Sequence, residues 1–388
     1  MGGPAGAASA AGGSGPVGHP ATSLAFTHAN YHAVKACASA SRPGFATCLA
    51  QRLVPDKGTH VRRTAATGLT PSDIQSAYNL SGRSAGGRTV AIVDAYGYPK
   101  AASDLATYRA NYGLPACTTS NGCLSIVDQN GGGNLPPTDI GWDQEQALDL
   151  DAVSAACPSC HILLVQADSP SFANLGTAVD TAASKPGVAA ISNSYGGGDA
   201  ADSAYGAYYN HPGVAVTASS GDNGYQGASF PASSHYVTGI GGTTLVADSS
   251  ARGWGETVWS GSGSGCTTLN AAPAGQTYAM THCNGRAMAD VSADADPASG
   301  LIIYGPTSSG ASAWQQFGGT SLASPIVASV YALSGNTAGY ANTIPYANPG
   351  GLNDVTSGRN GSCSYWCAAG SGWDGPTGLG TPIGTSAF

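Results

Sequence analysis

Charged side chains are scarce in this sequence: Asp, Glu, Lys and Arg make up 9% of its 388 residues, whereas ordinary soluble proteins contain about a quarter. The 14 Lys and Arg residues are fewer than the 22 Asp and Glu residues, and the formal net charge is −8. The chain therefore lacks the basic patch of a nucleic-acid-binding protein. It also lacks a run of about 18 apolar residues, so we expect no membrane-spanning helix. We predict a monomer without nucleic-acid or membrane partners.

The ten cysteines occur as five pairs of near neighbours. This pattern indicates local disulfides and an oxidising, extracellular compartment, so we expect a secreted protein. A metal or haem site is the alternative for Cys157 and Cys160, which His161 follows directly. However, His161 opens an apolar run that is typical of a buried strand. The expected pairs are Cys37 with Cys48, Cys117 with Cys123, Cys157 with Cys160, Cys266 with Cys283, and Cys363 with Cys367.

The first part of the chain differs in composition from the rest. Residues 1–20 are mostly Gly, Ala, Ser and Pro, which predicts a flexible segment. Residues 21–67 hold six of the 14 basic residues. We interpret them as a short propeptide; an N-terminal extension of the main domain, residues 68–388, is the alternative. We predict that activation removes this segment, because exposed linkers such as the one at Arg62-Arg63 are usual sites of proteolysis.

From Thr70 onwards, short apolar runs alternate with helical patterns. Pro71, directly after Thr70, and Asp73 in the first turn mark the start of the first helix. Alternation of this kind predicts an α/β fold, with a parallel sheet covered by helices on both faces. Ligands of such sheets bind at the carboxyl ends of the strands. The expected strands are 90–93, 162–165, 188–191, 214–216 and 236–238, and the expected helices are 99–112, 143–156, 171–185 and 201–210.

A glycine-rich turn at Gly319-Thr320-Ser321 leads into a helix that we expect over residues 322–333. Ser321 would lie at the N-terminus of this helix, where backbone N–H groups favour developing negative charge. This position suits a nucleophile beside an oxyanion hole. A simple helix N-cap is the alternative interpretation.

A serine nucleophile needs a base, and histidine is the usual one. His60 and Asp94 resemble parts of the subtilisin histidine and aspartate motifs. Subtilisin has the order Asp, His, Ser, but here His60 precedes Asp94 and lies in the basic N-terminal segment. We therefore consider a carboxylate base instead.

Two carboxylates share one face of the helix expected at residues 143–156. Helical spacing places Glu145 and Asp149 one turn apart on an otherwise apolar stripe. Burial would hinder the ionisation of both, and the pair would titrate as a unit. Asp143 and Asp151 lie off this stripe, and we expect them in solvent.

A further acid, Asp222, follows the expected strand at residues 214–216, in the sequence Ser219-Ser220-Gly221-Asp222. An acid in a glycine turn at the carboxyl end of a strand is well placed to meet a ligand. An ordinary turn is the alternative, because Gly, Asp and Asn are common turn residues.

Together these motifs resemble the sedolisins, serine-carboxyl peptidases with the subtilisin fold, over about residues 70–388. Glu145 and Asp149 match the family's Glu-x-x-x-Asp helix, Asp222 its oxyanion aspartate and Ser321 its nucleophile, in the same order. The resemblance implies that Ser321 attacks the scissile carbonyl and that Glu145 acts as base. It also implies that Asp149 holds Glu145 and that Asp222 donates a hydrogen bond to the oxyanion. We expect an endopeptidase that acts on polypeptides at acid pH, because the donor carboxyl must be protonated.

The resemblance implies two further sites. The C-terminal tail matches the family's calcium loop, and carboxylates with backbone carbonyls from glycine turns suit Ca²⁺. The segment after the strand at 188–191 matches the cleft-lining segment, where an extended peptide would pair. The calcium ligands are expected at Asp354, Val355, Gly370, Gly372 and Asp374, and the substrate-binding residues at Ser192, Asn193, Ser194, Tyr195 and Gly196.

Two other functions are alternatives: a secreted binding protein on an inactive peptidase scaffold, and a subtilisin-type, histidine-dependent peptidase. The intact set of Glu145, Asp149, Asp222 and Ser321 argues against the first alternative. The order of histidine and aspartate argues against the second.

Overall fold

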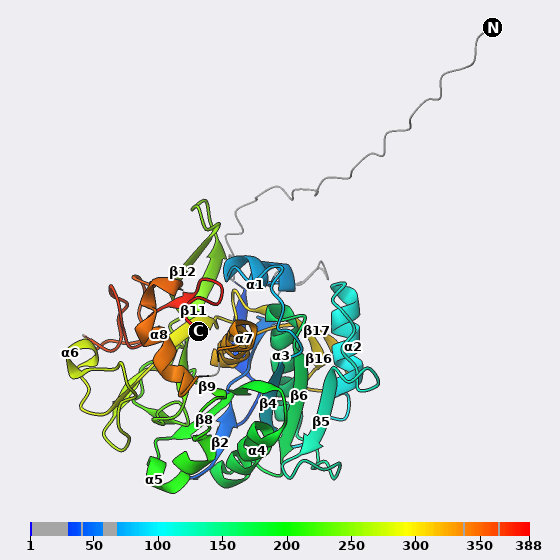
Figure 1. Ribbon diagram of the computed structural model, residues 1–388, viewed down its shortest axis with the longest axis horizontal. Helices are drawn as coiled ribbons and strands as arrows, with labels where there is room; N and C mark the ends of the chain where they lie inside the picture. Colours follow the sequence, from blue (N-terminus) through cyan, green and yellow to red (C-terminus); the bar gives the residue numbers. More distant parts are fainter. Residues whose placement is uncertain (2–29, 40–41, 57–67, 337, 364) are drawn as a thin grey trace.

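A mostly parallel sheet of eight strands forms the centre of the computed structural model, which describes residues 1, 30–39, 42–56, 68–336, 338–363 and 365–388 (Figure 1). The strand order is β12-β11-β9-β7-β4-β6-β5, and β15 pairs with β11. Only the pair β11–β12 is antiparallel. The strands are β4 (Thr89–Ala95), β5 (Leu124–Asp128), β6 (His161–Ala167), β7 (Val188–Asn193), β9 (Ala215–Ser219), β11 (Thr238–Ala247), β12 (Trp254–Val258) and β15 (Val291–Asp294).

Helices cover both faces of this sheet, which confirms the predicted α/β class. α3 (Ile140–Ala156) and α7 (Thr320–Ser334) pack on one face, and α4 (Phe172–Ser184) packs on the other. The two faces of the sheet border two hydrophobic cores, and successive side chains of a buried strand point into opposite cores. In β4, Val90 and Ile92 join the core that contains α3 and α7, whereas Ala91 and Val93 join the core that contains α4.

The helix α3 is buried along its whole length, and within it only Ile140 is exposed. α1 (Pro71–Ala77), α2 (Ala101–Asn111) and β16 (Leu301–Pro306) pack against it in addition to the sheet and α7. The expectation that Asp143 and Asp151 face solvent is therefore wrong. The backbone N–H of Tyr304 donates to Asp151 at 2.8 Å, and burial raises the pKa of both acids.

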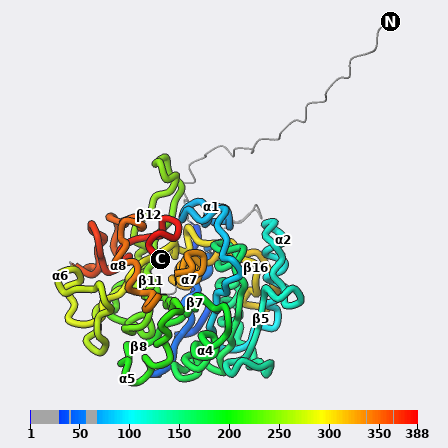
Figure 2. The backbone as a smooth tube through the Cα atoms, viewed as in Figure 1, coloured from blue at the N-terminus to red at the C-terminus, as the bar shows by residue number. Residues whose placement is uncertain are grey.

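The described part of the predicted propeptide contributes three strands, and two of them, β2 (Ala46–Cys48) and β3 (Gln51–Pro55), pair with strands of the main domain. β1 (Tyr31–Lys35) pairs with β3, and β3 also pairs with β17 (Ser312–Gly318). β2 pairs antiparallel with β8 (Tyr195–Gly198). Figure 2 traces this blue segment into the body of the molecule. His60, Arg62 and Arg63 lie outside the described residues.

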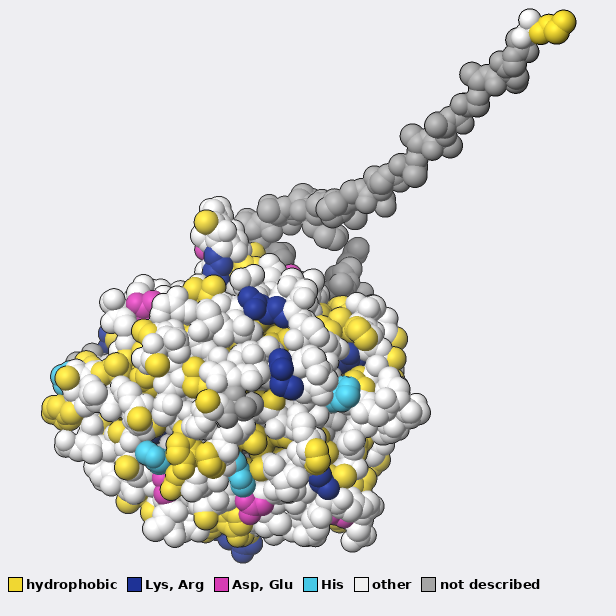
Figure 3. Space-filling view, in the orientation of Figure 1, with side chains coloured by type: hydrophobic (Ala, Val, Ile, Leu, Met, Phe, Trp, Pro, Cys, Tyr) yellow, Lys and Arg dark blue, Asp and Glu magenta, His cyan; other side chains and the backbone are white. Residues whose placement is uncertain are grey.

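All five predicted cysteine pairs form disulfides, so Cys157 and Cys160 do not form a haem or metal site. In the described part of the chain, no helix is long and apolar enough to cross a membrane. Charged side chains are sparse on the face drawn in Figure 3. The smaller elements are α5 (Asp202–Tyr205), η1 (Gly206–Tyr209), β10 (Ser229–Phe230), β13 (Gly265–Thr267), α6 (Tyr278–Thr281), β14 (Arg286–Met288), η2 (Ala341–Thr343), α8 (Ile344–Ala347), η3 (Pro349–Gly351), β18 (Leu352–Asn353) and β19 (Thr381–Pro382).

Candidate active site

Ser321 is the second residue of α7, which begins at Thr320, two residues before the predicted start. Gly319 precedes the helix with a φ of 102°, a left-handed conformation that favours glycine. The Ser321 hydroxyl donates to the carbonyl oxygen of Ser194 at 3.2 Å, and the serine is buried. The first turn of α7 thus presents a serine at a helix N-terminus, where the dipole stabilises negative charge.

Glu145 and Asp149 lie one turn apart on α3, and both are fully buried. Oε2 of Glu145 accepts a hydrogen bond from the backbone N–H of Ala50 at 2.7 Å. Oδ1 of Asp149 accepts one from the hydroxyl of Ser194 at 2.8 Å. Burial is the main cause that raises both pKa values well above the usual range, whereas a hydrogen bond with Ser321 lowers that of Glu145 in part. The helical stripe therefore places a carboxyl group with a raised pKa beside the serine.

A third buried carboxyl, Asp94, lies next to this pair at the end of β4. Neither of its oxygens has a hydrogen-bond partner among the described residues, and burial raises its pKa to about 8. Its charge raises the pKa of Glu145 and of Asp149 in turn. The sequence indicated Asp94 only as a possible partner of His60. The signal for its actual place was an acid at the carboxyl end of a buried strand.

Asp222 follows β9 and hydrogen-bonds the start of α7. Its Oδ1 accepts from the N–H of Thr320 at 2.8 Å and from the Thr320 hydroxyl at 2.7 Å. Its Oδ2 accepts from the side-chain amide of Gln51 at 3.0 Å, and it lies 2.6 Å from where a Cβ on Gly319 would stand. Burial raises the pKa of Asp222 to about 7, although these hydrogen bonds oppose the shift. The four predicted catalytic residues thus converge on the first turn of α7.

The predicted substrate-binding segment turns only some of its residues toward this site. Ser192, Asn193 and Tyr195 are fully buried, and their polar side-chain atoms bond within the core. Ser194 carries the two hydrogen bonds described above, and Gly196 lines a cavity of the site. Alternation along an extended chain explains why Asn193 and Tyr195 lie opposite Ser194, because successive side chains point to opposite sides. Ser192 shares the side of Ser194 but bonds Ser324 of α7.

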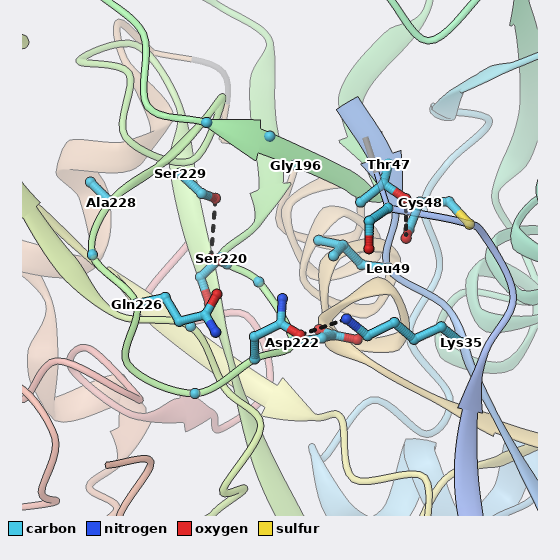
Figure 4. A pocket seen from close by; sticks show the side chains of 18 of the residues that line it. Lys35, Thr47, Cys48, Leu49, Gly196, Ser220, Asp222, Gln226, Ala228 and Ser229 are labelled. Carbon is cyan, nitrogen blue, oxygen red and sulfur yellow. Dashed lines mark hydrogen bonds between the residues drawn. The ribbon is translucent and has the colours of Figure 1, made fainter. Parts of the chain in front are cut away.

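The cavity has a volume of about 300 Å³ and lies between β8 and the loop that carries Asp222 (Figure 4). Many of its lining residues are glycines, which leave room for a side chain of another segment. Leu49 lies at its wall, and Cδ1 of Leu49 is 3.6 Å from where a Cβ on Gly196 would stand. At the cavity edge, the Lys35 ammonium donates to the side-chain oxygen of Asn223 at 2.6 Å.

The predicted calcium ligands lie in one C-terminal loop. Asp354 accepts the N–H of Gly372 at 2.9 Å, Asp374 accepts that of Gly370 at 3.3 Å, and Val355 is buried. Burial raises the pKa of Asp374 to about 7, and the charge of Asp354 adds to the shift. Two mutually repelling carboxylates fit a hard cation such as Ca²⁺. No cluster of three or more His, Cys, Asp or Glu side chains suited to a metal occurs in the described residues, so backbone oxygens would have to complete the site.

Solved structures share this architecture. One is fervidolysin from Fervidobacterium pennivorans, a keratinolytic enzyme related to subtilisin. The match covers 87% of the present chain and 50% of the fervidolysin chain, with a TM-score of 0.50 and 15% sequence identity. Another is Pseudomonas sedolisin, a serine-carboxyl proteinase. The match covers 83% of the present chain and 97% of the sedolisin chain, with a TM-score of 0.69 and 28% sequence identity. The fold is therefore the subtilisin-like α/β fold.

Sequence comparison narrows the class further, although no family model matches the chain. Kumamolisin of Bacillus sp. strain MN-32 is 33% identical over 364 residues, which cover 82% of the chain and 63% of that protein. Sedolisin of Pseudomonas sp. strain 101 is 30% identical over 81% of the chain and 60% of that protein. The chain belongs to the sedolisin family of serine-carboxyl peptidases. It spans less than two thirds of the length of these relatives.

Proposed function

We propose that the protein is a secreted endopeptidase that cleaves polypeptides at acid pH with Ser321, Glu145 and Asp149 as its catalytic triad and Asp222 in the oxyanion hole. The observation that carries this proposal is the buried pair Glu145 and Asp149 beside a serine at the N-terminus of α7. Membership of a peptidase family supports a polypeptide substrate. The five disulfides are consistent with an extracellular location.

In this mechanism, Ser321 Oγ attacks the scissile carbonyl carbon and passes its proton to Glu145. The negative charge that develops on the carbonyl oxygen is stabilised by the protonated Asp222 carboxyl and by the N-terminus of α7. Glu145 then gives the proton to the leaving nitrogen, and a water molecule repeats the sequence on the acyl-enzyme. Asp149 orients Glu145 and is itself held by the hydroxyl of Ser194.

The pKa shifts favour activity in acid. Asp222 can donate a hydrogen bond only while it is protonated, and its pKa of about 7 sets the upper limit of that range. The activity should therefore fall as the pH rises through neutrality. Glu145 must be ionised to accept the proton of Ser321, and its raised pKa shifts this acid limit upward, so the rate should also fall on the acid side of the optimum.

We further propose that Ca²⁺ binds at the C-terminal loop through Asp354 and Asp374, and that backbone oxygens of Val355, Gly370 and Gly372 complete the site. When bound, the ion supplies fixed positive charge that holds the two carboxylates together. In the described residues, none of the five proposed ligands hydrogen-bonds a catalytic side chain, so we assign the ion to stability. We expect the protease to act as a monomer.

The alternatives are a binding protein on an inactive scaffold and a histidine-dependent subtilisin. Among the described residues, no histidine hydrogen-bonds Ser321, Glu145 or Asp149. Cleavage of a denatured protein across pH by the wild type, by Ser321→Ala and by Glu145→Ala separates the three readings. Activity near neutrality that survives Glu145→Ala contradicts the carboxylate mechanism, and equal, negligible cleavage by all three favours the binding protein.

A further inference from the structure

Ser194 connects two parts of the candidate active site that come from different elements. It lies between β7 and β8, and it is fully buried. Its hydroxyl donates to Oδ1 of Asp149 on α3 at 2.8 Å, and its carbonyl oxygen accepts the hydroxyl of Ser321 on α7 at 3.2 Å. The side chain that the sequence assigned to substrate binding therefore bonds a catalytic acid, while the backbone of the same residue faces the nucleophile.

The hydroxyl proton of Ser194 is donated to the acid rather than to the backbone of α7. Besides Asp149, the hydroxyl has one other acceptor within reach in the described residues, the carbonyl oxygen of Ser321, at 3.4 Å. A serine hydroxyl has one proton to donate, and a charged acceptor makes the shorter and stronger bond. The 2.8 Å contact with Asp149 is therefore the hydrogen bond that forms.

Asp149 depends on this single hydrogen bond. In the part of the chain that the structure describes, its other oxygen, Oδ2, has no hydrogen-bond partner, and neither has Oε1 of Glu145, one helical turn away. Side chains at this spacing are neighbours on a helix surface, so the two unpartnered oxygens can share one proton. A buried carboxylate with only one donor is poorly stabilised. Loss of the Ser194 hydroxyl would leave the charge of Asp149 without a donor among these residues.

Nearby charges do not substitute for the hydroxyl. The ion pairs of the described residues do not include Glu145 or Asp149. The charge of Asp94, at the end of β4, raises the pKa of both members of the pair, and that of Asp222, in the loop after β9, raises the pKa of Glu145. α7 and β16 bring no charged side chain to α3. The charged groups on the other helices that pack against α3 are Asp73 of α1, which caps its own helix, and Asp104 and Arg109 of α2, which act on Asp151.

We propose that Ser194 is a positioning residue of the carboxyl pair: its hydroxyl orients Asp149 and stabilises the state in which Glu145 and Asp149 together carry one negative charge. This inference rests on the proposed function, because Glu145 accepts the Ser321 proton from that state. The pair titrates as a unit, and a hydrogen bond to the charged form of a carboxyl group lowers its pKa. The Ser194 hydroxyl has this effect on Asp149. Ser194 therefore extends activity toward lower pH.

The test compares kcat and kcat/KM on one peptide across pH for the wild type and Ser194→Ala. The variant should lower kcat about tenfold and should move the acid limb of the kcat/KM profile upward by about one pH unit, because Asp149 loses its hydrogen bond. KM should change less than about threefold, since the variant keeps the backbone carbonyl of Ser194. Ser194→Thr keeps a hydroxyl on an extended backbone that suits a β-branched residue, and it should return the acid limb to the wild-type position.

Ser299→Ala is the matched control. The Ser299 hydroxyl donates to Oδ1 of Asp294 at 2.6 Å, and burial raises the pKa of that acid well above its usual range. Within the described ranges, neither of these side chains hydrogen-bonds the four catalytic side chains. The control thus removes the same kind of buried bond elsewhere in the molecule. It should lower Tm, as Ser194→Ala should, but it should leave the acid limb in place.

The outcomes separate a positioning role from a structural one. A shifted acid limb in Ser194→Ala that is restored in Ser194→Thr and absent in Ser299→Ala would support the inference. An acid limb in Ser194→Ala that matches that of Ser299→Ala would overturn it, and a shift that Ser194→Thr fails to reverse would contradict a role of the hydroxyl. If the wild type hydrolyses no peptide, or if its hydrolysis survives Ser321→Ala, the proposed function itself fails, and this inference fails with it.

Discussion

Asp94→Asn should reduce the loss of stability that we expect when the pH rises from acid to neutral. The pKa of Asp94 is raised from 3.8 to about 8 by burial. Between these values the unfolded chain loses its proton while the folded chain keeps it, so rising pH destabilises the fold by about 1.4 kcal/mol per unit. The loss is absent below about pH 4 and is complete above about pH 8, with an upper limit of about 6 kcal/mol. Asparagine has no proton to lose, and therefore this contribution disappears.

The free energy of unfolding should be measured in urea at pH 5 and pH 7.5, in a Ser321→Ala background that prevents self-digestion. Across that interval the wild-type carboxyl should account for up to about 3 kcal/mol of lost stability, and Asp94→Asn should lack this component. Asp168→Asn, at an exposed acid, is the control and should keep the wild-type slope. Equal slopes for Asp94→Asn and Asp168→Asn would refute the reasoning.

Three other predictions concern the site and the C-terminal loop. Asp222→Ala should lower kcat about 100- to 1,000-fold with little change in KM. Asp222→Asn should keep part of the activity and should lose less of it than the wild type as the pH rises. A near-normal kcat in Asp222→Ala would show that Asp222 is an ordinary turn residue without a catalytic role. Ca²⁺ at about 100 times its Kd should raise the Tm of the wild type by about 5 °C, and Asp374→Asn should abolish this rise. An equal rise in the wild type and in Asp374→Asn would exclude the C-terminal loop as the calcium site. Gly319→Ala should lower Tm, because a Cβ would overlap the Leu49 backbone and approach Oδ2 of Asp222. Gly310→Ala, with a φ of 84° and open space around it, should lower Tm only slightly, and equal effects on Tm would contradict this interpretation.

Much of the central architecture could be predicted from local patterns. Four of the five expected strands correspond to β4, β6, β7 and β9, because buried parallel strands are continuous apolar runs. The fifth, at residues 236–238, shares only Thr238 with β11. Helical spacing placed Glu145 and Asp149 together on the buried side of α3. These features depend on residues that lie close together in the sequence. The periodicity of apolar residues was therefore sufficient to predict them.

The parts that could not be predicted depend on contacts between distant segments. β3 pairs with β17, more than 250 residues later in the chain, and no local pattern in residues 51–55 indicates that partner. Asp143 and Asp151 were expected in solvent, because periodicity cannot show that α2 and β16 cover the outer side of α3. The role of Asp94 was missed for the same reason: its neighbours Glu145 and Asp149 come from another element.

The measurement that tests the account most directly is kcat/KM on one peptide across pH for the wild type and Glu145→Gln. The substitution keeps the shape of the side chain but removes its ability to accept the Ser321 proton. The account predicts a wild-type maximum in acid and a loss of about 100- to 10,000-fold in Glu145→Gln at every pH. A Glu145→Gln profile that matches the wild type in height and in pH dependence would contradict the carboxylate mechanism.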